Sequence, residues 1–150
     1  MAIMSSQNAF GYDRDSQVVL RAIDATARTA SGSDTAISLK TLTAAYWDND
    51  EIPDQAFKVV IDVDSADNTT GNETYEIFVE VDTAVGMATA VTVGHLILSA
   101  ATAVGQYEIL LDGDTISDLE PAATHIRTRA VLGGTTPIFH FHAWLANPVH

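Results

Sequence analysis

The sequence contains no cysteine, and its 150 residues include only 7 Lys and Arg against 20 Asp and Glu. Without cysteine, the chain has no disulfide scaffold, no thiol nucleophile and no cysteine-ligated zinc site. The net charge of -13 at pH 7 repels phosphate backbones. We therefore expect no nucleic-acid partner.

Long apolar runs are also missing. The apolar stretches end after a few residues, far short of the ~20 that cross a bilayer, so we expect no membrane partner. Residues 1–17 lack a basic start followed by a long apolar run, which predicts synthesis in the cytoplasm without a signal peptide.

The composition does provide a hydrophobic core. Hydrophobic residues make up 47% of the chain, and 150 residues is the usual size of one domain. No internal repeat or linker divides the chain, so residues 18–150 are expected to form a single domain. Residues 1–17 form an aperiodic N-terminal arm that carries Phe10 and Tyr12. These aromatics either fold back on their own domain or anchor the arm on another chain.

Alternation of apolar and polar residues with period two indicates β-strands along most of the domain. In residues 57–64, Phe57, Val59, Ile61 and Val63 share one face. The expected strands, roughly eight, lie near residues 18–23, 35–40, 57–64, 74–82, 91–98, 107–111, 125–130 and 138–145. Turn-forming residues separate them, including those at 67–72, 112–114 and 133–137. Only residues 38–46 and 85–90 could hold a helical turn or two. The pattern predicts an all-β, two-sheet antiparallel sandwich, with a jelly roll as the expected topology.

Charge is unevenly distributed along the chain. Residues 59–120 contain twelve acidic residues and no Lys or Arg. Residues 121–150 contain Arg127 and Arg129, no acid, and four of the five histidines. One interpretation is that the acids lie on solvated strand faces and loops. The other is that the less acidic ends of the chain face a partner while the middle faces water.

Two groups of residues have the spacing of metal ligands. His140 and His142 lie on one face of a strand, about 7 Å apart, as in the H-x-H pair of cupins. The acid that cupins place shortly afterwards is missing, because no Asp or Glu follows Glu120. We therefore interpret these histidines as a solvent- or partner-facing pair beside Trp144.

The second group, Asp62-x-Asp64-x-x-Asp67 with Glu73, is similar to a calcium loop. Ala66 stands where that loop needs an oxygen ligand, and Asp67 stands where it needs a glycine. Neither group predicts a metal, and no spacing of Ser, His and Asp indicates a catalytic triad. We expect no enzyme, no cofactor and no metal, while a loop calcium site stays open as an alternative.

The order of these segments along the chain is itself informative. An Ala/Thr/Ser-rich stretch at 22–36 leads into a short strand, and a hairpin of long alternating strands spans 57–82. The apolar stretch HLILSAATAVGQYEILLDG follows at 95–113, and 125–145 holds a strand, a Gly/Thr turn and a last strand. Over about residues 12–145 the chain resembles the capsid cement proteins of tailed bacteriophages, of the jelly-roll type, which are also called decoration or head-stabilisation proteins.

This resemblance implies a structural virion protein. Such proteins bind the outer capsid surface as homo-oligomers, here a homodimer or homotrimer, and stabilise the shell by bridging major capsid subunits. They are made in the host cytoplasm and end on the virion. The expected capsid or subunit contacts come from the arm and the last two strands: Phe10, Tyr12, Arg14, Arg127, Arg129, His140, His142 and Trp144.

Two alternatives belong to other functional classes. One is a carbohydrate- or receptor-binding β-sandwich of a phage tail, in which exposed Trp144, Tyr46 and Trp47 stack on sugars. The other is a cupin-like metal protein that uses His140 and His142.

Overall fold

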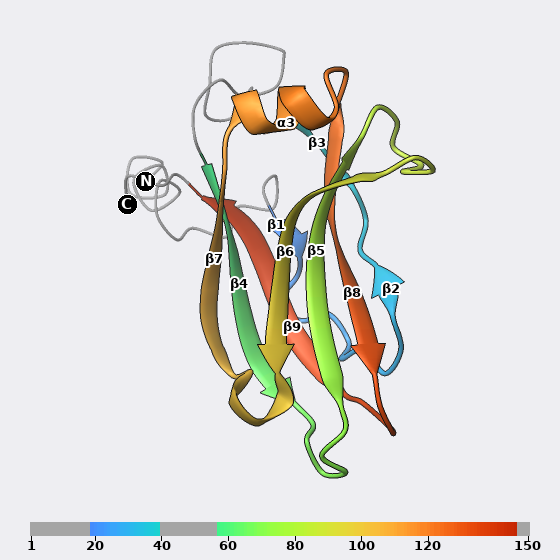
Figure 1. Ribbon diagram of the computed structural model, residues 1–150, viewed down its shortest axis with the longest axis vertical. Helices are drawn as coiled ribbons and strands as arrows, with labels where there is room; N and C mark the ends of the chain where they lie inside the picture. The colour runs from blue at the N-terminus through green and yellow to red at the C-terminus, as the bar shows by residue number, and fades with distance from the viewer. Residues whose placement is uncertain (1–18, 40–56, 147–150) are drawn as a thin grey trace.

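The computed structural model describes residues 19–39 and 57–146, and two antiparallel β-sheets packed face to face dominate this part of the chain (Figure 1). Its elements, in chain order, are β1 (Val19–Arg21), β2 (Gly32–Ser33), β3 (Ile37–Ser38), β4 (Phe57–Ala66), β5 (Thr74–Asp82), β6 (Val91–Ser99), the 3-10 turn η1 (Ala100–Thr102), β7 (Gly105–Leu111), the helix α3 (Gly113–Leu119), β8 (His125–Gly133) and β9 (Phe139–Ala146). The expected all-β sandwich is confirmed.

The strands divide into two layers. The first sheet, called sheet A, has the order β1-β9-β4-β7, and the second, sheet B, has the order β2-β8-β5-β6, with β3 also paired to β8. Helix α3 lies across one end of the sandwich (Figure 1). Strands β6 and β7 therefore end their sheets, among the strands that the structure describes, and both lie on the same side of the molecule.

The core forms where the alternating faces of the two sheets meet. In β4, Phe57, Val59, Ile61 and Val63 are all buried in it, as the periodicity predicts. The inward residues of β5 and β9 fill the same core: Tyr75, Ile77, Val79, Val81, Phe139, Phe141, Ala143 and Leu145. Tyr75 stacks on Phe139 with ring centroids 4.7 Å apart, and its hydroxyl donates to the carbonyl of Asp67. Tyr75 thus packs its ring in the core and satisfies its hydroxyl with a hydrogen bond.

The sequence prediction fails at α3, since Gly113–Leu119 is helical where a simple turn was expected at residues 112–114. Asp112 starts the helix: its side chain accepts a hydrogen bond of 2.7 Å from the backbone N–H of Thr115. Ile116, fully buried, anchors the helix to the core. Residues 85–90 form turns instead of a helix, and most of 38–46 lies outside the described residues. No helix in the described ranges is both long and apolar enough to span a membrane.

The weak strands expected near residues 18–23 and 35–40 correspond to β1 and β3, and β2 lies between them. A buried ion-pair network ties this part of the chain to the sandwich. Asp34 accepts from Arg21 at 2.6 Å, from Arg28 at 2.7 Å and from the hydroxyl of Thr128 at 2.8 Å. Arg21 also donates to the carbonyl of Phe141 and lies over its ring.

Replacing Asp34 with Ala should destabilise the fold by about 3–5 kcal/mol, because Arg21 and Arg28 lose their shared carboxylate in a mostly buried setting. Urea denaturation followed by circular dichroism measures the change. The control is Asp118→Ala at an exposed acid of α3, which should change the free energy of unfolding by less than about 0.5 kcal/mol. Equal effects of the two variants would contradict the role of Asp34.

The loop between β5 and β6 is held by a second carboxylate. Asp82 accepts backbone hydrogen bonds from Thr89 at 2.8 Å and from Thr83 at 2.6 Å, and hydroxyl bonds from both threonines. These bonds, led by the one from the Thr89 backbone, lower the pKa of Asp82 below its ordinary value of 3.8. The ionised form is therefore the one that stabilises the fold.

A lowered folded-state pKa means that Asp82 contributes stability above its unfolded-state pKa and loses it as the pH falls through the folded-state value. The variant Asp82→Asn should therefore have a lower melting temperature than the wild type at pH 7, and the difference should shrink as the pH falls below about 4. Melting curves at pH 7, 5 and 3 test this expectation. A difference that stays constant down to pH 3 would count against it.

Candidate functional site

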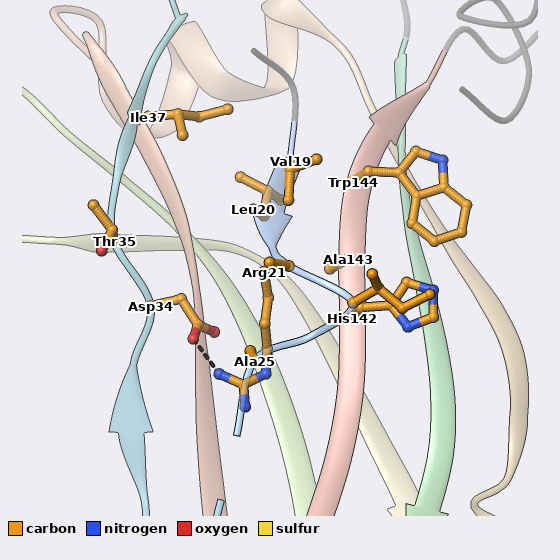
Figure 2. A pocket seen from close by; sticks show the side chains of 12 residues that line it. Val19, Leu20, Arg21, Ala25, Asp34, Thr35, Ile37, His142, Ala143 and Trp144 are labelled. Atoms are coloured by element: carbon orange, nitrogen blue, oxygen red, sulfur yellow. Dashed lines mark hydrogen bonds and ion pairs between the residues drawn. The ribbon is translucent and has the colours of Figure 1, made fainter. Parts of the chain in front are cut away.

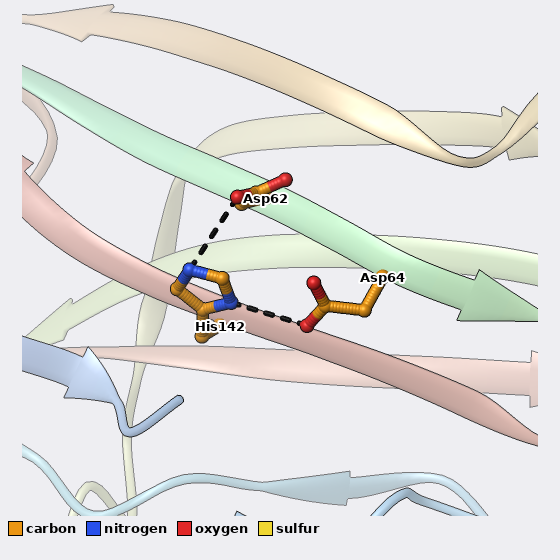
Figure 3. Close-up of side chains that lie close together, drawn as sticks. All are labelled: Asp62, Asp64 and His142. Atoms are coloured by element: carbon orange, nitrogen blue, oxygen red, sulfur yellow. Dashed lines mark hydrogen bonds and ion pairs between the residues drawn. The ribbon is translucent and has the colours of Figure 1, made fainter. Parts of the chain in front are cut away.

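The pairing of β4 with β9 brings together the two groups of residues that the sequence presents separately. Asp62 and His142 are direct cross-strand partners in the antiparallel register (Figure 3). The register shifts between Val63 and Ser65, so Asp64 is an extra residue on β4. Such a bulge redirects the side chain that it carries. Asp64 is thereby brought to the same histidine as Asp62.

The resulting Asp–His cluster consists of Asp62, Asp64, His140 and His142. One oxygen of Asp64 lies 3.2 Å from Nδ1 of His142 and 2.9 Å from Nδ1 of His140. On the other side of the His142 ring, Nε2 lies 3.5 Å from an oxygen of Asp62. Nε2 of His140 donates to the carbonyl of Ala25 at 3.0 Å. Both carboxylates therefore converge on one imidazole, and the second histidine supports Asp64.

Exposure differs sharply within the Asp–His cluster. The His142 side chain is only 2% exposed, whereas those of Asp62 and Asp64 are 31% and 40% exposed. The sequence interpretation was a solvent- or partner-facing histidine pair, and the burial of His142 excludes the solvent-facing position for that residue. His140 and His142 do share the outer face of β9, but this face is largely buried.

Trp144 lies on the same outer face of β9 and is 1% exposed, so the expectation of an exposed indole is also wrong. It forms a second buried cluster with Val60 and Ala146, separate from the main core. Its ring stacks on that of His142, with centroids 5.4 Å apart. Trp144 and His142 thereby form one wall beside the Asp–His cluster.

A pocket of about 560 Å³ borders this wall (Figure 2). It lies between β1, the segment just before β3, and β9, and most of its lining is apolar. Arg21 and Asp34, which are among its few charged lining residues, are paired with each other at 2.6 Å. Their charges are therefore already neutralised before any ligand enters.

The predicted contact residues Arg127 and Arg129 lie on the outer face of sheet B. Both pair with Glu80 on the neighbouring β5, at 2.9 Å each, and Arg129 also lies over the ring of Phe78. The histidines and Trp144 belong to sheet A, so the fold does not bring the arginines together with them. Phe10, Tyr12 and Arg14 lie outside the described residues, as do Tyr46 and Trp47.

The basic side chains of the described residues form ion pairs within the protein. Each Lys or Arg in residues 19–39 and 57–146 forms an ion pair with an acid: Arg21 and Arg28 with Asp34, Lys58 with Glu108, and Arg127 and Arg129 with Glu80. This pairing leaves the excess of acidic groups to define the outer charge.

The calcium-loop pattern is not assembled as a single site. Asp67 accepts a hydrogen bond from the hydroxyl of Thr69. Glu73 accepts from the backbone N–H groups of Thr70 and Gly71 and so stabilises the β4–β5 turn. Asp62 and Asp64 turn instead to His142, and these three are the group within the described ranges whose geometry could hold a metal ion. The signal for this group in the sequence is an Asp-x-Asp pattern on one strand and a His-x-His pattern on another. Only the register of β4 and β9 brings the two patterns together.

A different surface lies along β6 and β7. Ile97 on β6 is 70% exposed on the outer face of sheet B, and Leu110 on β7 is 66% exposed on the outer face of sheet A. Val104, in the connection between these strands, is also exposed. Neither strand contains Lys, Arg or Pro, which are residues that proteins use to prevent edge strands from pairing with other chains. We call this surface the β6–β7 edge.

Comparison with known proteins adds no assignment. No protein-family model matches the sequence, and no curated protein matches it either. Function is therefore argued from the fold, the Asp–His cluster and the β6–β7 edge.

The buried position of Trp144 can be tested directly. Replacing Trp144 with Ala should destabilise the protein by about 3–5 kcal/mol, because a large buried side chain leaves a cavity. Ile97→Ala at an exposed position is the matched control and should change stability by less than about 0.5 kcal/mol. Chemical denaturation of both variants measures the difference. A Trp144 variant as stable as the wild type would mean that the indole is not buried in solution.

Proposed function

We propose that this chain is a structural virion protein: a capsid cement protein that binds the outer surface of a phage shell as a homodimer or homotrimer and bridges major capsid subunits. The observation that carries the proposal is the β6–β7 edge. Two edge strands without Lys, Arg or Pro leave backbone groups at which strands of another chain can pair. A protein that works by joining other proteins needs such a surface.

The strand order supports the jelly-roll part of the proposal. The two strand orders match place by place, so that each strand of sheet A occupies the place of its neighbour in sequence on sheet B: β1 and β2, β9 and β8, β4 and β5, and β7 and β6. A long hairpin rolled up on itself produces this nested order, which is the jelly-roll arrangement. Jelly rolls are common in viral capsid proteins, although a fold alone does not determine a function.

The charge distribution fits a position outside the shell. The net charge is -13, and the described cations are held in internal ion pairs. Such a protein is repelled by packaged DNA and free to contact protein surfaces. Several modest contacts made by one oligomer would reinforce one another through their high effective concentration, so no single patch needs to be strong.

The alternatives receive less support. A sugar-binding module that stacks glycans on Trp144 conflicts with the burial of that indole. A cupin-like enzyme needs His140 and His142 to point at one ion, whereas Nε2 of His140 is occupied by the Ala25 carbonyl. The Asp–His cluster also contains no arrangement of nucleophile and base.

Disrupting the β6–β7 edge should remove binding to shells while leaving the fold intact. The double variant Ile97→Lys with Leu110→Lys places two charges on exposed edge positions, where they should hardly affect stability. We expect it to be monomeric by light scattering and to bind at least tenfold less to purified empty shells in a sedimentation assay.

Ile138→Lys is the matched control, because Ile138 is an exposed hydrophobic residue outside the edge strands. It should keep wild-type oligomeric state and occupancy on shells. Failure of the wild-type protein to bind shells would refute the cement function. Wild-type occupancy by the double variant would refute the β6–β7 edge as the docking surface.

A further inference from the structure

The Asp–His cluster contains a buried nitrogen that its protein surroundings do not satisfy. Asp64 accepts a hydrogen bond from Nδ1 of His142 at 3.2 Å, and an ionised carboxylate can only accept, so the network assigns the ring proton to Nδ1. In the neutral ring Nε2 then carries a lone pair. This atom is buried and has no hydrogen-bond partner among the described residues.

The lone pair of Nε2 faces a second acceptor. The nearest charged atom is an oxygen of Asp62, 3.5 Å away, so two electron-rich atoms oppose each other across a short gap. A buried polar atom without a partner costs about 1–3 kcal/mol. A cation placed between the ring and the Asp62 carboxylate would satisfy both sides.

The donor set specifies the kind of cation. One ligand atom from each of Asp62, Asp64 and His142 lies within 4.8 Å of the other two. Zinc and manganese take imidazole and carboxylate ligands at about 2.0–2.2 Å, whereas calcium prefers a shell of oxygens. Asp62 is partly exposed, so it can close on an ion beside Nε2 by rotating its side chain and leave positions open for water.

The supporting contacts resemble those around metal-binding histidines. Such a histidine commonly donates its other ring N–H to a carboxylate, which fixes the ring orientation, as Asp64 does for His142. Because Asp64 makes this bond at Nδ1, it orients the ring so that Nε2 faces Asp62 on the other side. His140 contacts Asp64 at 2.9 Å and is itself held by the Ala25 carbonyl, which makes it a positioning residue.

From this geometry we propose a binding site for one divalent transition-metal ion, with Zn²⁺ the preferred occupant, held by Nε2 of His142 and by carboxylate oxygens of Asp62, while Asp64 fixes the ring through Nδ1. The ion would join β4 to β9 at the centre of sheet A. The cement function does not need this site, and either proposal can fail without the other.

The test begins with the full-length protein freed of metal by dialysis against a chelator. Titration with Zn²⁺ followed by calorimetry, with elemental analysis after gel filtration, should give one tight site per chain. The melting temperature should rise with the Zn²⁺ concentration, because the ion binds the folded state. Co²⁺ should bind the same site and give visible absorption bands.

The deciding variants keep the buried ring in place. Asp62→Asn combined with Asp64→Asn changes two partly exposed residues and should weaken Zn²⁺ binding at least 100-fold and remove the Co²⁺ bands. His95→Gln is the control, because His95 pairs with Glu76 at 3.0 Å on sheet B, away from the cluster. His140→Gln should weaken affinity by about 10–100-fold and leave the shape of the Co²⁺ spectrum unchanged.

Two results would overturn the proposal. One is the absence of stoichiometric Zn²⁺, Mn²⁺ or Co²⁺ binding to the metal-free wild-type protein. The other is equal binding by the double aspartate variant and the wild type, which would assign the metal to histidines elsewhere in the chain. Nitrogen-15 NMR of the imidazoles provides the complementary readout: a second proton on His142 at neutral pH would show that a proton fills the gap in place of a metal.

Discussion

The antiparallel register between β4 and β9 is the constraint on which the rest of the structure depends. Because side chains alternate along a strand, one register sends Val63 and Phe141 into the core and opposes Asp62 to His142 on the outer face. A slip by one residue would move the apolar set outward and the charged set inward. The core therefore fixes the position of the Asp–His cluster, although the two share no side chain.

The outer faces of the two sheets differ in how their side chains pack. On sheet B, Glu80 holds both Arg127 and Arg129, while Phe78 lies between Arg129 and the ring of His95. On sheet A, the buried Trp144 and Val60 lie beside the Lys58–Glu108 pair and the Asp–His cluster. The Lys and Arg side chains of the described residues are thus paired with acids inside the protein. The remaining acidic groups determine the charge that other surfaces meet.

Local pattern predicted the strands and their inward faces, because period-two alternation in residues such as Phe57, Val59 and Ile61 reports directly which side chains share a face. The pattern does not report what lies against that face, so Trp144 was placed in solvent although it is buried. The local pattern does not predict helix α3, because its start depends on one side-chain hydrogen bond that Asp112 accepts from the backbone N–H of Thr115. The Asp–His cluster was missed because it needs a long-range register and the bulge at Asp64, which neither local motif encodes.

The two surfaces that carry the proposals meet at β4. This strand pairs with β9 on one side and with β7 on the other, and Lys58 reaches from it to Glu108 of β7 at 3.0 Å. An edge strand has only one neighbour to hold its shape, so the geometry of β7 depends on how rigidly β4 is placed. An ion between β4 and β9 would restrict β4 on the side opposite β7.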